Sequence, residues 1–173
     1  MSDLTPARIC EVQRDLLLVL TEAGPISLIP TDSAGDYAVG DWVLSDGVKA
    51  VHRLDPFSNL TRKAAGHVNY QQRIAGNIDT IAIVTSCNAD FNVPRLERYL
   101  ALAFEAEVTP VILLTKSDLC ADPTPYVEQA QSISSRVPGV LLNAKSQEAK
   151  DQLAPWCKPG DTLVFLGTSG VGK

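Results

Sequence analysis

A glycine-rich stretch, Gly167 to Lys173, reads G-T-S-G-V-G-K and fits the pattern G-x-x-x-x-G-K. Glycines allow backbone N–H groups to turn inward around a polyphosphate, and a lysine ammonium can reach the β- and γ-phosphates as a point charge. A glycine-rich turn without a ligand would read the same way. Because the stretch directly follows the apolar run 162–166, we predict a phosphate-binding loop made of Gly167, Thr168, Ser169, Gly170, Val171, Gly172 and Lys173.

A second polar loop follows the apolar run 111–114 and consists of Thr115, Lys116, Ser117 and Asp118. The carboxylate of Asp118 could accept two hydrogen bonds from the edge of a guanine base, while the stem of Lys116 lies along the ring face. Alone, T-K-x-D fits a solvated loop with a capping aspartate equally well. Beside a phosphate site, base reading becomes attractive, because a purine without guanine's donors would leave the carboxylate unpaired.

A third loop follows the apolar run 140–142 and consists of Asn143, Ala144 and Lys145. A small residue at its centre would let a backbone N–H approach the guanine carbonyl. The triplet is uninformative alone and gains meaning only from its position after a strand.

The elements around these loops alternate between strands and helices. Apolar runs predict strands at 80–84, 111–114, 140–142 and 162–166, and helices are predicted from about 92, over 124–136 and after 146. This order is typical of a doubly wound parallel sheet, whose ligands bind beyond the carboxyl ends of the strands. All three polar loops lie at such ends.

The first third of the chain has a different pattern. Five short apolar runs separated by turns, at 8–12, 15–20, 25–29, 42–44 and 48–54, favour a five-stranded OB-like barrel. Trp42 lies within one of these runs and is predicted to be in the barrel core. We predict two domains, 1–66 for the barrel with a polar linker from 55 onward, and 67–173 for the sheet.

Charge is unevenly distributed along the chain. Residues 1–48 have two basic and eight acidic groups, whereas residues 49–73 have five basic and one acidic group, within a chain of net charge −5. The overall charge argues against indiscriminate coating of nucleic acid. The basic stretch could contact RNA phosphates or be a solvated linker, and its cations are Lys49, Arg53, Arg62, Lys63 and Arg73.

Other classes of protein receive no support from the sequence. The four cysteines are too far apart for a C-x-x-C metal pair and are read as reduced thiols, so no metal site is predicted. The longest apolar run is too short to cross a membrane, and the N-terminus does not resemble a secretion signal. We therefore expect a cytoplasmic protein, with a monomer as the default oligomeric state.

Four further segments extend the pattern of the three loops. They read V-G-D-W-V at 39–43, R-K-A-A-G at 62–66, I-A-G-N-I-D at 74–79 and F-N-V-P-R-L-E-R-Y-L at 91–100. The polar loops look like GTPase motifs G4, G5 and G1, in that order, which is circularly permuted. From about residue 7 onward the chain resembles the ribosome small-subunit-dependent GTPase A family, RsgA or YjeQ.

The resemblance implies an OB domain that contacts the small ribosomal subunit and its rRNA, a permuted P-loop GTPase domain, and a C-terminal zinc-binding domain. It also implies GTP or GDP with Mg²⁺ as the ligand, late maturation of the 30S subunit as the role, and hydrolysis activated by that subunit.

Two departures from the family pattern matter. Thr115 stands where G4 usually has Asn, which puts the contacts of that side chain in question. The chain stops at Lys173, so we expect the Mg²⁺-binding Ser/Thr, the catalytic and switch residues and the Zn²⁺ domain to lie beyond it. The GTPase domain would then be incomplete, and we expect this chain by itself to bind GTP weakly and not to hydrolyse it. The alternative is a non-enzymatic RNA- or ribosome-binding module with a vestigial nucleotide site; an ATP-using P-loop protein is disfavoured by Asp118.

Overall fold

The computed structural model describes residues 3–63 and 71–173. Contacts divide the chain into two compact units, Met1–Ile78 and Asp79–Lys173. The predicted boundary between residues 66 and 67 lies outside the described residues.

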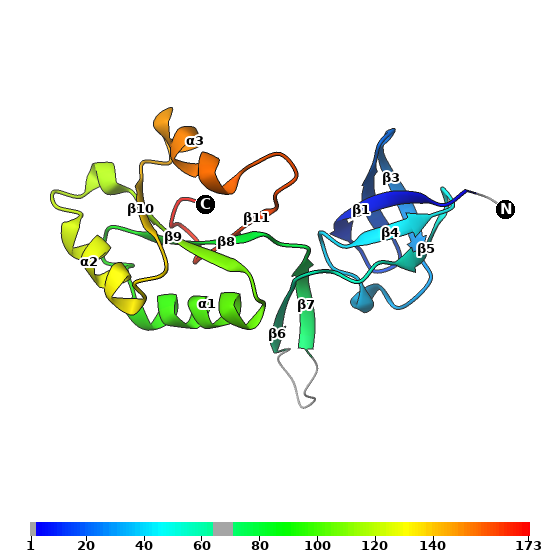
Figure 1. Cartoon of the computed structure of the whole chain (residues 1–173), viewed down its shortest axis with the longest axis horizontal. Coiled ribbons are helices and arrows are strands. Elements are labelled where there is room, and N and C mark those ends of the chain that lie inside the picture. The colour runs from blue at the N-terminus through cyan, green and yellow to red at the C-terminus, as the bar shows by residue number, and fades with distance from the viewer. Residues whose placement is uncertain (1–2, 64–70) are drawn as a thin grey trace. The chain divides into compact units, whose positions relative to one another are not determined.

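The first unit contains a closed five-stranded barrel with the strand order β1-β2-β3-β5-β4 (Figure 1). Alternate side chains of its strands point inward and form an apolar core, and the predicted OB-like barrel is confirmed. The 3₁₀ turn η1 (Ala34–Asp36) lies between β3 and β4. The strands are β1 (Thr5–Val12), β2 (Leu17–Thr21), β3 (Gly24–Pro30), β4 (Trp42–Ser45) and β5 (Lys49–Arg53). The core residues are Ala7, Ile9, Leu17, Val19, Leu28, Tyr37, Val43 and Ala50.

Trp42 is not in this core, so the prediction for it was wrong. Its side chain is 39% exposed, whereas the next residue, Val43, is fully buried. Successive side chains of a strand point to opposite faces, so with Val43 inward Trp42 must face outward. The guanidinium of Arg8, from the neighbouring strand β1, lies over the indole ring at 5.7 Å from its centroid.

A hairpin follows the barrel where the sequence predicted a linker. Its strands are β6 (Asn59–Lys63) and β7 (Gln71–Gly76), which pair antiparallel. The linker prediction was wrong because these strands have too few apolar residues to be recognised as strands in the sequence. Among the described residues of the hairpin, Leu60 and Ala75 are the buried hydrophobic ones. Such a ribbon is marginal alone and depends on contacts with the barrel.

The second unit is a parallel sheet with the strand order β10-β9-β8-β11, as predicted. The helices α1 and α2 lie on one face of the sheet and α3 on the other (Figure 1). α1 begins at the N-cap Asn92, whose side chain accepts a hydrogen bond from the N–H of Arg95 at 2.9 Å, with Pro94 in the first turn. The elements are β8 (Thr80–Ser86), α1 (Val93–Glu105), β9 (Thr109–Thr115), η2 (Ser117–Leu119), α2 (Thr124–Ile133), β10 (Gly139–Leu142), α3 (Glu148–Leu153), η3 (Ala154–Trp156) and β11 (Leu163–Leu166).

The central strands β8 and β9 are buried along nearly their whole length. This explains why they appear in the sequence as continuous apolar runs, since helices cover both faces of the sheet. Helix α2 ends at Ile133, slightly before the predicted end at 136.

Candidate nucleotide site at the carboxyl ends of the strands

The three polar loops predicted to bind a nucleotide lie at one edge of the sheet. Because all four strands are parallel, their carboxyl ends share that edge. The loop 115–118 follows β9, the loop 143–145 follows β10, and the loop 167–173 follows β11. The end of β8 lies between those of β9 and β11.

The loop 167–173 is fixed to the sheet by Val171. This side chain is fully buried in a core cluster that includes Val84 and Val111. At the start of the loop, a Cβ added to Gly167 would lie 2.5 Å from the carbonyl oxygen of Val84, so only glycine fits so close to β8. These two contacts therefore fix the loop against the sheet, while Ser169, Gly170 and Gly172 are exposed to solvent.

Thr115 connects the loop after β9 to the loop after β11. The side chain is almost fully buried, and its hydroxyl lies within hydrogen-bonding range of two carbonyl oxygens, those of Thr85 at 3.0 Å and of Val171. A hydroxyl has one proton and donates it to one of these acceptors at a time. Although shorter than Asn, the side chain of Thr115 thus reaches the loop 167–173.

The residues predicted to read the base, Lys116 and Asp118, follow Thr115 in a tight turn. Lys116 adopts a left-handed conformation with φ of 57°, which redirects the chain from β9 into η2. Asp118 lies in this 3₁₀ turn and is exposed. Within residues 3–63 and 71–173 its carboxylate accepts no hydrogen bond, so both oxygens are available to a ligand.

The loop after β10 forms a turn closed by its own first residue. Asn143 accepts the N–H of Lys145 with its side chain at 3.0 Å and the N–H of Ser146 with its carbonyl at 2.9 Å. Ala144 and Lys145 are exposed at this turn. The structure thus places Ala144 at the sheet edge where the sequence predicted a backbone contact.

Lys173 folds back along its own loop. Its ammonium donates a hydrogen bond to the carbonyl of Gly167 at 2.5 Å, so the charge lies against the loop backbone. A lysine held there is close to the anion that the loop would surround.

The sequence interpretation did not consider the loop after β8, which lies at the same edge. The Cys87 N–H donates to the carbonyl of Thr115 at 2.9 Å, and Asn88 accepts the hydroxyl of Ser86 at 2.8 Å. Burial raises the pKa of the Cys87 thiol to about 11, with a smaller contribution from Cys120. The signal was available in the sequence, since every strand of a parallel sheet has a carboxyl end at the ligand-binding edge.

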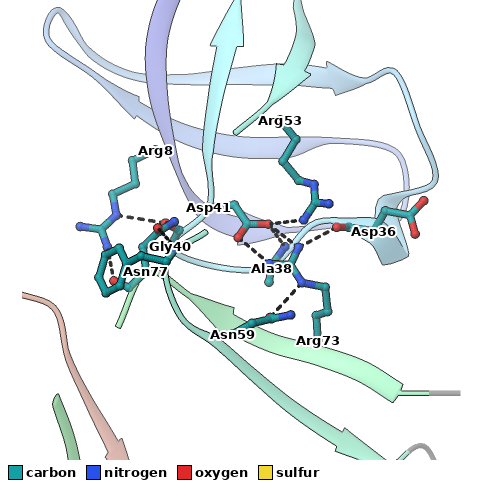
Figure 2. Close-up of polar contacts among 10 residues, drawn as sticks. Arg8, Asp36, Ala38, Gly40, Asp41, Arg53, Asn59, Arg73 and Asn77 are labelled. Carbon is teal, nitrogen blue, oxygen red and sulfur yellow. Dashed lines mark hydrogen bonds and ion pairs between the residues drawn. The ribbon is translucent and has the colours of Figure 1, made fainter. Parts of the chain in front are cut away.

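The cations predicted to contact RNA divide into two groups. Arg73 is engaged inside the first unit, where its guanidinium pairs with the fully buried carboxylate of Asp41 at 2.7 and 2.8 Å (Figure 2). Its remaining contacts are the side chain of Asn59 at 3.0 Å and the carbonyl of Asp36 at 2.8 Å. Arg53 approaches the same carboxylate at 3.8 Å. Because Arg73 and Arg53 offset the negative charge of the Asp41 carboxylate, less of their positive charge is available to attract RNA phosphates.

Two of the other predicted RNA-contacting cations lie at the surface. Lys49 is exposed, and so is Arg62, whose guanidinium donates to the side-chain oxygen of Gln72 at 3.1 and 2.9 Å. The side chain of Lys63 lies outside the described part of the chain.

The hairpin and barrel meet in a close backbone contact beside Asp41. Gly40 has φ of +91°, and a Cβ there would lie 2.2 Å from the carbonyl oxygen of Gly76. The side chain of Asn77 donates to the carbonyl of Gly40 at 2.9 Å. Two of the segments that carry the family resemblance, 39–43 and 74–79, are thus in contact with each other.

The described residues contain neither a metal-binding cluster nor a membrane-spanning helix. Within 3–63 and 71–173 there is no group of three or more His, Cys, Asp or Glu side chains arranged to hold a metal ion. No helix in the same ranges has the length and apolar character needed to span a bilayer.

A closed five-stranded barrel followed by a parallel sheet with these loops in this order defines a circularly permuted GTPase fold with an OB-like domain. The sequence profile of the RsgA GTPase family matches residues 54–173, and the chain belongs to this family.

Individual relatives agree with this assignment. The chain is 47% identical to the small ribosomal subunit biogenesis GTPase RsgA of Mesorhizobium japonicum, an alignment that covers 99% of this chain and 51% of that protein. It is 44% identical to the small ribosomal subunit biogenesis GTPase RsgA 2 of Vibrio parahaemolyticus, with 96% and 47% covered. The chain thus spans about half the length of the curated relatives it matches.

Solved structures share the fold. YjeQ from Thermotoga maritima superposes with a TM-score of 0.75 at 21% identity, covering 98% of this chain and 62% of that one. YloQ, described as a circularly permuted GTPase, superposes with a TM-score of 0.69 at 24% identity, covering 98% and 61%.

Proposed function

We propose that this chain forms the guanine-nucleotide-binding part of a GTPase that acts in late maturation of the small ribosomal subunit, in the cytoplasm. The observation that carries the proposal is the contact of Thr115 with Val171. It joins the loop that would read the base to the loop that would hold the phosphates, so that one ligand can engage both.

The nucleotide would be held by three sets of groups. The carboxylate of Asp118 would accept the two donors on the guanine edge, with the stem of Lys116 along the ring and a backbone contact at Ala144. The N–H groups of the loop 167–173 and the ammonium of Lys173 would surround the phosphates. Family membership implies Mg²⁺ with the nucleotide, and the metal would neutralise charge developing on the phosphates during hydrolysis.

Competition titrations test the base-reading role of Asp118. Because the 173-residue chain by itself is expected to bind GTP weakly, it is used at a concentration high enough to bind a fluorescent GTP analogue with Mg²⁺; unlabelled GTP should then displace the probe and ATP should not. Asp118→Asn should weaken GTP binding roughly 30- to 1,000-fold, corresponding to about 2–4 kcal/mol for lost charged hydrogen bonds. The same change should favour xanthosine triphosphate, because an amide donates to the xanthine 2-carbonyl while accepting from N1–H.

Asp151→Asn, an exposed carboxylate on α3, is the matched control and should leave both affinities unchanged. Equal displacement by ATP and GTP would refute the guanine-reading role of the loop after β9.

We also propose that the first unit contacts ribosomal RNA through Lys49 and Arg62, with Arg53 in part; Lys63, also predicted from the sequence, belongs to the same proposal. The support is the exposure and positive charge of Lys49 and Arg62, since phosphates are bound mainly through such cations. Lys49→Glu should weaken binding to small subunits and reduce its salt dependence, whereas Lys158→Glu, an exposed lysine of the second unit, should not. An unchanged salt dependence in the Lys49 variant would contradict this contact.

A further inference from the structure

Thr115 is the first residue of the loop proposed to read the base, and both its hydroxyl and its carbonyl are engaged within the protein. The hydroxyl lies 3.0 Å from the carbonyl oxygen of Thr85 and also contacts the carbonyl of Val171. The carbonyl of Thr115 accepts the N–H of Cys87 at 2.9 Å. Because the residue is only 1% exposed, these contacts are shielded from solvent.

The loop 167–173 also packs against the side chain of Thr115. A Cβ added to Gly172 would lie 3.6 Å from the hydroxyl oxygen and 3.7 Å from the Cβ of Thr115, which is van der Waals distance. The side chain therefore lies between the end of β8 and the loop that would hold the phosphates, and its position is fixed from both sides.

The number of protons decides what this side chain can offer a ligand. A threonine hydroxyl has one proton, and two carbonyl oxygens within the protein already compete for it. Turning that proton toward a ligand would leave both carbonyls without it, and buried acceptors without a donor are costly. An Asn amide at the same position would have two N–H donors, one for a carbonyl and one for a ligand.

A guanine base needs both acceptors and donors from its site. Its own donors, N1–H and the 2-amino group, would pair with Asp118 under the proposed function, and its O6 with the backbone at Ala144. The next polar atom along the ring is N7, an acceptor that requires a donor from the protein. Thr115 is the side chain that joins the base-reading loop to the phosphate loop, and its only donor is already engaged.

We infer that residue 115 does not contact N7, and that the site accepts guanine nucleotides whether or not position 7 of the base carries an acceptor. Base selection is then left to Asp118 and to the backbone at Ala144. This inference rests on the proposed function and deepens it, because it names the part of the base on which affinity does not depend.

Competition by 7-deaza-GTP is the test, since this nucleotide has C–H in place of N7 and keeps both donors for Asp118. Against the fluorescent GTP analogue with Mg²⁺, 7-deaza-GTP and GTP should bind the 173-residue chain within about twofold of each other, because no hydrogen bond is lost. Thr115→Asn adds a second N–H and should make 7-deaza-GTP about three- to tenfold weaker than GTP, the range for one uncharged hydrogen bond. Asp151→Asn is the matched control, because it introduces the same amide at an exposed position on α3 and should leave the ratio unchanged.

Inosine triphosphate distinguishes a failure of this inference from a failure of the proposed function. It lacks the 2-amino group and should bind at least about tenfold more weakly than GTP, because Asp118 loses one charged hydrogen bond. Inosine triphosphate that competes as well as GTP would overturn the proposed reading of guanine and this inference with it.

Two other results would overturn this inference alone, with inosine triphosphate still weak. One is a preference of about threefold or more for GTP over 7-deaza-GTP in the unchanged chain, because N7 would then receive a hydrogen bond. The other is a Thr115→Asn chain that gains no such preference, because residue 115 would then not face N7.

Discussion

We expect the stability of the first unit to depend more on the buried carboxylate of Asp41 than on any other single charged group of that unit. It is fully buried, accepts the N–H of Ala38 at 3.0 Å, and pairs with Arg73 through both oxygens. Removing one partner of a buried pair leaves the other uncompensated, which typically costs about 3–5 kcal/mol. Arg73 can recover part of this cost, because its side chain is 13% exposed and keeps its contact with Asn59.

We therefore expect Asp41→Asn to lower the free energy of unfolding of the first unit by about 2–4 kcal/mol. The amide is nearly the same size as the carboxylate and can still accept the N–H of Ala38, so the loss reports mainly on charge. Arg73→Met should cost a similar amount, since it leaves Asp41 with only the distant Arg53. The double variant should cost less than the sum, because the two single changes remove the same interaction.

The assay is urea unfolding followed by Trp42 emission in a Trp156→Phe background, so that the signal comes from the barrel alone. Asp32→Asn is the matched control, as this carboxylate is exposed, and it should change stability by less than about 0.5 kcal/mol. A loss below about 1 kcal/mol for Asp41→Asn, or additive effects of the two single changes, would refute the reasoning that a buried ion pair holds the hairpin to the barrel.

Further predictions concern the second unit and a barrel turn. Thr115→Val should destabilise the second unit by about 1–3 kcal/mol and speed hydrogen exchange in the phosphate loop, whereas Thr115→Ser should do neither; equal effects would contradict the hydroxyl contact. At pH 8, a thiol reagent should label Cys10 and Cys157 quickly, because both side chains are exposed. Cys87 should be labelled only after unfolding, since a pKa of about 11 leaves roughly one thousandth of this thiol as thiolate at pH 8. Mass spectrometry of Cys87→Ser should show that the slowly labelled group has been lost. The carboxylate of Asp46 accepts hydrogen bonds from the N–H groups of Lys49 and Val48, which lower its pKa below 3.8. Asp46→Ala should therefore reduce stability above pH 3.8, and the difference in stability between the variant and the unchanged chain should vanish as acid protonates the carboxylate of the folded protein. A difference that grows in acid would reverse the assigned sign.

The fold could be predicted from the sequence where burial alone determines the pattern. β8 and β9 are covered on both faces, so every residue of their runs is apolar or small, and the barrel strands alternate because one face is buried. The ends of the parallel strands then indicate where a ligand binds, which is why the three polar loops could be brought to one edge.

The hairpin and the position of Trp42 could not be predicted in this way, because both depend on partners distant in the sequence. β6 and β7 have few apolar residues, and their attachment comes from Arg73 reaching Asp41. Trp42 is exposed because Val43 is buried, and its ring is covered by Arg8 through a strand register that no local pattern reveals. Polar contacts across long sequence separations leave no periodic signal.

The Asp41 pair also changes what the basic stretch can do. A sequence count assigns five cations to residues 49–73, but Arg73 and Arg53 lie against a buried carboxylate, so the positive charge facing outward is smaller than the count. Two or three phosphate contacts would give a slope of log affinity against log salt of only about −1.4 to −2.1 on single-stranded RNA. We therefore expect charge to make a modest contribution to RNA binding by the first unit, with shape or a second contact supplying the rest.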